Sequence, residues 1–156
     1  MVEATTGLTI RAARAEDTDA IHEVFVSAIR SIDGSDYSPE QKAAWEKAVR
    51  PDSWATRMLE FEFKVAEFDG KTVGFASWSK TDLEHIYVAS DSRRQGVGST
   101  LMEAVLEHFG KQEVMLTASL NAVKFYAKYG FLEEMTLVKQ REGVDIPCIR
   151  MKRPAV

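Results

Sequence analysis

The sequence contains only one cysteine, Cys148, among its 156 residues. A single cysteine cannot form an internal disulfide, and structural disulfides belong to oxidising compartments. A chain of this length can bury a hydrophobic core without covalent cross-links. We therefore expect a protein of a reducing compartment, the cytoplasm.

Long apolar runs and an excess of basic residues are also missing. No stretch approaches the roughly 20 apolar residues that cross a bilayer, and residues 1–6 lack the basic segment and apolar core of a secretory leader. The 20 basic and 24 acidic residues give a net charge of −4, which argues against a broad basic surface for nucleic acid. We expect neither a membrane nor a nucleic-acid partner.

No repeat, low-complexity segment or linker divides the chain, so residues 1–156 are predicted to form a single domain. Period-two alternation marks the strands, and apolar residues spaced three and four apart mark the helices. The predicted order is β, α, α, then three strands, then α, β, α, β, β. This order favours an α+β fold with a mixed, mostly antiparallel central sheet of about seven strands flanked by helices, rather than regular βαβ units. The strongest hairpin signal is Asp69-Gly70 between two candidate strands.

A basic, glycine-containing turn lies between a predicted strand and a predicted helix. Gly96 and Gly98 fall where the helix begins, and Arg93 and Arg94 precede them. The first N–H groups of a helix have no intrahelical partner, and glycines let a bulky anion approach them. The residues after Gly98 do not fit a Walker loop or a dinucleotide fingerprint. The turn predicts a phosphate-binding site of another kind.

Two motifs together carry a family resemblance. Arg93-x-x-Gly96-x-Gly98 follows the central strand, and Asn121-x-x-x-Phe125-Tyr126-x-x-x-Gly130-Phe131 follows the next one. The chain thereby resembles the GCN5-related N-acetyltransferase (GNAT) superfamily, and within it a bacterial branch of small uncharacterised acetyltransferases. The resemblance implies an acyltransferase that uses acetyl-CoA as cosubstrate, needs no metal, and moves the acetyl group directly to a primary amine. A small-molecule acceptor is expected, and a homodimer is compatible with the resemblance.

The resemblance also implies which residues bind acetyl-CoA. In the family the glycine turn binds the pyrophosphate, the preceding strand pairs with the pantetheine arm through its main chain, and the later helix lies along that arm. Carried onto this sequence, the binding residues are Ile86, Tyr87, Val88, Arg93, Arg94, Gln95, Gly96, Val97, Gly98, Ser99, Asn121 and Phe125.

Two proton-transfer roles follow from the chemistry, because the attacking ammonium must lose a proton and the leaving thiolate benefits from a donor. Family members have acids or histidines at the positions of Glu84 and Asp82, so the resemblance implies Glu84 as the first candidate base and Asp82 as the second. Strict alternation puts both on one face of the strand with Ile86 and Val88. The alternative is that both carboxylates are simply exposed at a strand edge. Alternation points His85 to the other face, as a packed or surface histidine.

Tyr126 matches the family's tyrosine near the thioester sulfur and is the candidate acid. It also belongs to an apolar stripe at helical spacing, so a plain core role is the alternative. Asn121 could equally cap its helix.

The acceptor is expected to contact the first helices and the loop between them. The candidate lining residues are Phe25, Arg30, Tyr37 and Trp45, although aromatic residues at helical spacing are usually core. The negative net charge mildly favours a cationic acceptor. Two other functions stay open: a non-catalytic acyl-CoA sensor, and an acetyltransferase for protein lysines or N-termini.

Overall fold

The computed structural model of the chain describes residues 7–92 and 95–156. Its centre is a seven-stranded sheet with the order β1-β2-β3-β4-β5-β7-β6. Every neighbouring pair is antiparallel except β4 and β5, which are parallel. The strands are β1 (Leu8–Ala12), β2 (Glu62–Phe68), β3 (Lys71–Trp78), β4 (Asp82–Val88), β5 (Val114–Ser119), β6 (Leu132–Arg141) and β7 (Val144–Arg153). The α+β class and the mixed, mostly antiparallel sheet are confirmed.

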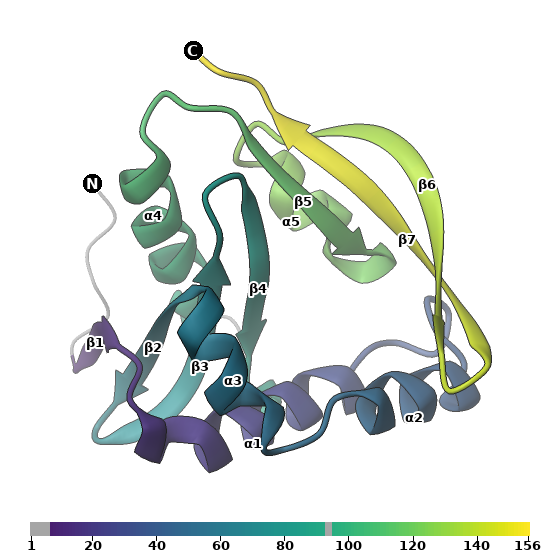
Figure 1. Ribbon diagram of the computed structural model, residues 1–156, viewed down its shortest axis with the longest axis horizontal. Helices are drawn as coiled ribbons and strands as arrows, with labels where there is room; N and C mark the ends of the chain where they lie inside the picture. The colour runs from purple at the N-terminus through teal and green to yellow at the C-terminus, as the bar shows by residue number, and fades with distance from the viewer. Residues whose placement is uncertain (1–6, 93–94) are drawn as a thin grey trace.

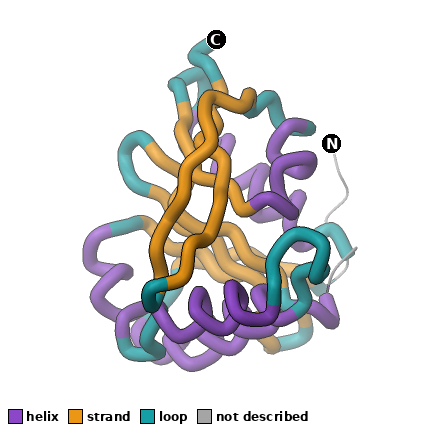
Figure 2. The backbone as a smooth tube through the Cα atoms, turned by 90° about the vertical axis from the view of Figure 1, so that its right-hand side faces the viewer, coloured by secondary structure: helices purple, strands orange, loops and turns teal. Residues whose placement is uncertain are grey.

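Helices cover both faces of the sheet (Figures 1 and 2). They are α1 (Thr18–Arg30), α2 (Pro39–Ala48), α3 (Ser53–Glu60), α4 (Val97–Phe109) and α5 (Val123–Ala127). On one face, Leu101 and Val105 of α4 belong to a buried cluster with Leu116 of β5. On the other face, Phe25 of α1 and Trp54 of α3 share a second cluster with residues of β2 and β3. The sheet is therefore buried on both sides near its centre, where apolar area removed from water stabilises the fold by roughly 25 cal/mol per Å².

Local sequence signals account for the boundaries of several elements. Asp69 and Gly70 have φ values of 50° and 79° in the β2–β3 turn, as a two-residue hairpin requires. The Ser38 hydroxyl accepts a hydrogen bond from the Gln41 N–H at the start of α2, which satisfies one unpaired helix donor. The predicted helix that carries Phe125 and Tyr126 is short. A 3₁₀ turn (Leu120–Ala122) precedes an α5 of only five residues.

Strand β4 contains a bulge, so the regular alternation of its side chains expected from the sequence is wrong at this point. Ser77 pairs with His85, but the next residue of β3, Trp78, pairs with Leu83, so Glu84 is the extra residue. Leu83 therefore joins the α4-side core with Ile86 and Val88. Asp82 and Glu84 do not share one regular face with Ile86 and Val88, because an inserted residue reverses the side-chain direction before it.

The neighbouring strands β4 and β5 separate after a short contact. Within the described ranges they pair only through Asp82 with Met115 and Leu83 with Leu116. From Glu84 to Val88, the edge of β4 that faces β5 has no ladder partner in the sheet. The two strands thus form a fork, and the start of α4 follows the open end of β4 through the segment 89–96.

No helix among the described residues is both long and apolar enough to cross a bilayer.

Candidate active site

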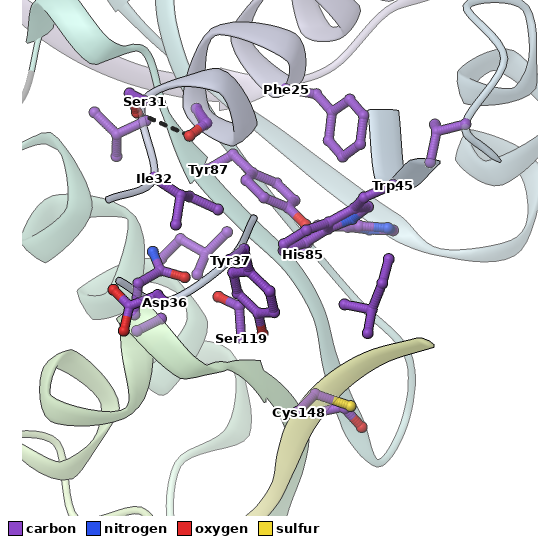
Figure 3. Close-up of a pocket in the computed structure, with 18 of the residues that line it drawn as sticks. Phe25, Ser31, Ile32, Asp36, Tyr37, Trp45, His85, Tyr87, Ser119 and Cys148 are labelled. Carbon is purple, nitrogen blue, oxygen red and sulfur yellow. Dashed lines mark hydrogen bonds between the residues drawn. The ribbon is translucent and has the colours of Figure 1, made fainter. Parts of the chain in front are cut away.

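A pocket of about 870 Å³ occupies the fork between β4 and β5 and continues toward α1 and α3. Its walls come from β4, β5, the start of α4, α5, α1 and α2 with the segment between them, α3 and the β6–β7 hairpin. Figure 3 shows part of this lining, including Phe25, Trp45 and His85. The lining residues taken up below are Phe25, Asp33, Asp36, Tyr37, Trp45, Arg57, Glu84, His85, Ile86, Tyr87, Val88, Gly98, Ser119, Asn121, Phe125, Tyr126, Lys139, Arg141 and Cys148.

One end of the pocket lies at the start of α4. Gly96 precedes the helix with a φ of 78°, a left-handed conformation that only glycine adopts without strain. A Cβ on Gly74 of β3 would lie 2.8 Å from Val97, so this glycine lets the helix start pack tightly on the sheet. No side chain caps the start of α4, and the first N–H groups of a helix have no intrahelical partner, so a phosphate site here stays a prediction.

The cofactor candidates taken from the sequence fall around this end, as far as they are described. Ile86, Tyr87, Val88, Gly98, Asn121 and Phe125 line the pocket. Gln95, Gly96, Val97 and Ser99 belong to the helix start beside it, with Val97 buried. A Cβ at position 98 would lie 3.5 Å from the Phe125 ring, so the two motifs meet here. Arg93 and Arg94 lie outside the described residues.

Glu84 brings a carboxylate to the pocket through the β4 bulge. The Glu84 residue is exposed as a whole, as the strand-edge alternative expected, but desolvation of its carboxyl group at the pocket and the neighbouring charge of Asp82 together raise its pKa above the usual range. A raised pKa makes a carboxylate a stronger base.

The carboxylate of Asp82, the second candidate base, forms its hydrogen bonds outside the pocket. It accepts a hydrogen bond from Arg150 Nη1 at 2.7 Å and another from the Thr81 hydroxyl at 2.7 Å. Arg150 also donates to Thr117 Oγ1 at 3.2 Å, which ties β4 to β7 across β5. Asp82 is not among the residues that line the pocket. Its charge acts on the site indirectly, by raising the pKa of Glu84.

Tyr126 lies on α5 with 7% of its surface exposed, and it lines the pocket. Its ring packs against Phe125 and Phe131, in agreement with the alternative that Tyr126 belongs to an apolar stripe of the core. Its hydroxyl has no hydrogen-bond partner among the described residues, although a buried phenol usually has one. Burial raises the pKa of Tyr126, so the hydroxyl keeps its proton and can donate it into the pocket.

Three of the four acceptor candidates line the pocket: Phe25, Tyr37 and Trp45. Phe25 and Tyr37 are also core residues, each 1% exposed. Arg30 lies outside the pocket. Its guanidinium forms a two-pronged pair with Glu46 of α2, at 3.0 and 2.7 Å, and borders a separate hollow.

The pocket residues that were not singled out for the site from the sequence include Arg57, His85, Lys139 and Arg141. His85 was expected on the face away from the candidate bases, as a packed or surface histidine. Its ring does pack, with centroids 5.3 Å from Trp54 and 6.0 Å from Phe63, but it also lines the same pocket as Glu84. Burial lowers the pKa of His85 to about 3, so the imidazole is neutral at physiological pH. Cys148 also lines the pocket, and burial raises the pKa of its thiol, which disfavours a nucleophilic thiolate.

Comparisons with known proteins agree with this geometry. The family model "Acetyltransferase (GNAT) domain" matches residues 34–153. The chain is 26% identical over 125 residues to an uncharacterised N-acetyltransferase of Escherichia coli, YafP, covering 80% of this chain and 79% of that protein.

Solved structures extend the comparison. A GCN5-related N-acetyltransferase structure from Rhodopseudomonas palustris superposes with a TM-score of 0.90 at 28% identity, covering 100% of this chain and 99% of that one. The N-acetyltransferase PaiA of Thermoplasma acidophilum, solved with coenzyme A, shares the fold at a TM-score of 0.71 and 20% identity, covering 94% and 98% of the two chains. The chain belongs to the GNAT acetyltransferase family and is an acyltransferase.

Proposed function

We propose that this enzyme transfers the acetyl group of acetyl-CoA directly to the primary amine of a small molecule. The observation that carries the proposal is that Glu84 and Tyr126 reach the same pocket, which opens from the β4–β5 fork. The fork supplies an unpaired strand edge for the pantetheine arm, and the start of α4 supplies N–H groups for phosphate. Coenzyme A complexes of proteins with this fold support the same cosubstrate here.

The proposed proton path uses one residue on each side of the reaction. Acetyl-CoA brings an activated acyl group, so alignment and proton movement are what the protein must add. Glu84 accepts a proton from the acceptor ammonium, directly or through water, and the freed amine forms the new N–C bond. As the C–S bond breaks, the Tyr126 hydroxyl donates its proton to the departing sulfur, and the second proton that nitrogen loses on becoming an amide returns through water to the Tyr126 oxygen. The raised pKa of Glu84 suits its role as base, whereas the raised pKa of Tyr126 keeps its hydroxyl protonated and makes it a weaker acid, which can donate only once charge has developed on the sulfur.

The pocket wall favours a small acceptor over a protein segment. The Tyr37 hydroxyl donates to the Pro147 carbonyl at 2.6 Å and accepts from the Leu120 N–H at 3.0 Å. Gln41 Nε2 donates to the Asp145 carbonyl at 3.0 Å. These bonds tie the α1–α2 side to β7 and to the turn at Leu120, so this part of the wall is bridged, and an extended peptide would have to pass around it.

Release of the coenzyme A thiol across a panel of amines tests the proposal. We expect thiol release that depends on a small primary amine, with the acetylated amine found by mass spectrometry. Tight acetyl-CoA binding with no release on any acceptor would favour the sensor instead. Release with lysine peptides or N-terminal peptides alone would favour a protein acceptor.

A further inference from the structure

Three positively charged side chains line the pocket on the side away from the start of α4: Arg57 of α3 and Lys139 and Arg141 of β6. Their charges act on the same wall of the pocket: Arg57 and Lys139 add to the lowering of the His85 pKa that burial causes, and Lys139 and Arg141 oppose the rise in the Cys148 pKa that burial causes. Across the part of the chain that is described, none of the three forms an ion pair within 4 Å. Arg11, Arg30 and Arg150, in contrast, all pair with carboxylates.

Arg57 is held in place by neutral neighbours. Its guanidinium lies over the Trp54 ring at 4.8 Å, and Nη1 is 3.5 Å from His85 Nε2. A guanidinium cannot accept a hydrogen bond, so Nε2 is the acceptor and the imidazole proton lies on Nδ1. That proton faces the buried Ser77 hydroxyl at 2.5 Å. The chain Ser77–His85–Arg57 fixes the guanidinium without neutralising it.

A half-buried guanidinium without a carboxylate partner is unfavourable on its own. Burial is the largest influence on Arg57 and lowers its pKa, yet an arginine side chain stays protonated in proteins. An anion that binds beside it would regain the electrostatic energy lost on desolvation. The planar fork of a guanidinium matches a carboxylate with two parallel hydrogen bonds.

The positions of the pocket carboxylates and of the start of α4 indicate which of the two substrates the three cations face. Glu84 is adjacent to His85 on β4, so the base and the histidine that holds Arg57 are about 3.3 Å apart along the strand. Asp33 and Asp36 belong to the α1–α2 segment, and Figure 3 shows Asp36 well apart from His85. The start of α4 is farther away, since Val88 lies three residues, about 10 Å, beyond His85 on β4. The cations therefore face the acceptor rather than the phosphates of coenzyme A.

We propose that the acceptor is a small amine that also carries a carboxylate, and that Arg57 binds this carboxylate while Lys139 and Arg141 add positive charge around it. The inference rests on the proposed acetyl transfer, since it assigns the amine of the same molecule to Glu84. It reverses the expectation of a cationic acceptor drawn from the net charge, because the net charge describes the whole surface and these three cations lie in the pocket.

Matched pairs of amines test the proposal by kinetics. L-Phenylalanine is compared with phenethylamine, and L-methionine with 3-(methylthio)propylamine, so that each pair differs only by the carboxylate; spermidine and O-phosphoethanolamine complete the panel. We expect kcat/KM to favour an amino acid over its decarboxylated partner by about 100-fold, the scale of losing a charged, two-pronged contact. Preference for the decarboxylated amines or for spermidine would overturn the proposal. A preference for O-phosphoethanolamine alone would also overturn the proposal, because the cations would then recognise a phosphate and not a carboxylate.

Variants of Arg57 assign the effect to this side chain. Arg57→Gln should lower kcat/KM for the amino acid about 100-fold and leave the decarboxylated partner within about threefold, and Arg57→Lys should restore part of the loss. Arg50→Gln is the matched control, because Arg50 is exposed and paired with Asp52 at the surface. An equal loss on both members of a pair would show that Arg57 does not recognise the carboxylate. Thermal melting and coenzyme A affinity check that each variant is folded.

A binding measurement separates this proposal from the proposed reaction. Calorimetry with L-phenylalanine and L-methionine on protein saturated with coenzyme A needs no turnover. Binding to the wild type that Arg57→Gln abolishes would support carboxylate recognition even if no thiol were released, in which case the acetyl transfer would be the part that failed. Turnover of amines with no carboxylate preference would sustain the transfer and refute the recognition.

Discussion

The two ends of the pocket are built in different ways. The end at the start of α4 comes mainly from one continuous segment, β4 through α4, with α5 packed against it. The opposite end is assembled from α1, α3, β4 and the β6–β7 hairpin, which are far apart in the sequence. Backbone groups and glycines dominate the first end, and charged and aromatic side chains dominate the second. The first end can therefore keep one ligand while the side chains of the second end change with the acceptor.

If the two ends have these separate roles, substitutions in them should affect different quantities: the rate of the chemical step, the affinity for acetyl-CoA, or the properties of the acceptor end. Glu84 lies beside His85 on β4, on the acceptor side, and it is the proposed base, so Glu84→Gln should have the largest effect. We expect kcat/KM to fall about 100- to 1,000-fold, the usual range for removing a general base. Because the pKa of Glu84 is raised, the wild type should lose activity at a higher pH, as pH falls, than it would with an ordinary carboxylate as base. A pH–rate profile of the variant should lack that acidic limb, and an unchanged profile would exclude Glu84 as the base.

A change at the start of α4 should affect acetyl-CoA alone. Gly96→Trp forces a bulky residue into a left-handed conformation beside the free N–H groups. We expect coenzyme A affinity to fall about 100-fold, the scale of losing several charge-assisted hydrogen bonds, as measured by calorimetry. Wild-type affinity in the folded variant would remove the turn from the binding site.

Tyr126 should affect turnover more than binding of either ligand. Tyr126→Phe keeps the ring contacts with Phe125 and Phe131 and removes only the hydroxyl. We expect kcat to fall about 10- to 100-fold, with coenzyme A affinity within about twofold. The measurement is single-turnover kinetics, where chemistry limits the rate. A wild-type rate there would leave Tyr126 as a core residue only.

The smallest effect concerns stability at the acceptor end. The folded chain holds the pKa of His85 at about 3, against 6.5 in the unfolded chain. Between these values the unfolded state binds the extra proton, so stability falls as pH drops from 6.5 toward 3. At pH 5 the loss is about 2 kcal/mol. Urea unfolding at pH 7.5 and pH 5 should show a smaller loss in His85→Phe than in the wild type, and an equal loss would mean that His85 is not held neutral.

The sequence predicted the sheet, the hairpins and the helix start because those signals are local. Periodicity, Asp69-Gly70 and the Gly96/Gly98 pair each depend on neighbours a few residues away. The bulge escaped this reasoning because Asp82, Glu84, Ile86 and Val88 alternate regularly, although one signal was present. Leu83 is apolar between two acids, and it matches the apolar face of Ile86 and Val88 only if one residue is inserted.

The acceptor end was the least predictable part. Arg57 is distant in sequence from β4 and β6, and nothing in its own neighbourhood separates it from a surface arginine. Arg30 was chosen for its place on the first helix, but Glu46 of α2 neutralises it outside the pocket. Which arginine finds a carboxylate depends on tertiary neighbours, and periodicity carries no information about them.

The bulge in β4 also makes one shortened chain unusually useful. A deletion inside a central strand normally shifts the side chains before it to the wrong face of the sheet. Here β4 already has one residue more than β3 can pair with, so a chain lacking Glu84 could continue the ladder evenly from Gly74 to Trp78. Such a chain would lose the proposed base while keeping the pairing partners of its neighbours. It would be a scaffold for holding acetyl-CoA and an amine together long enough to crystallise both.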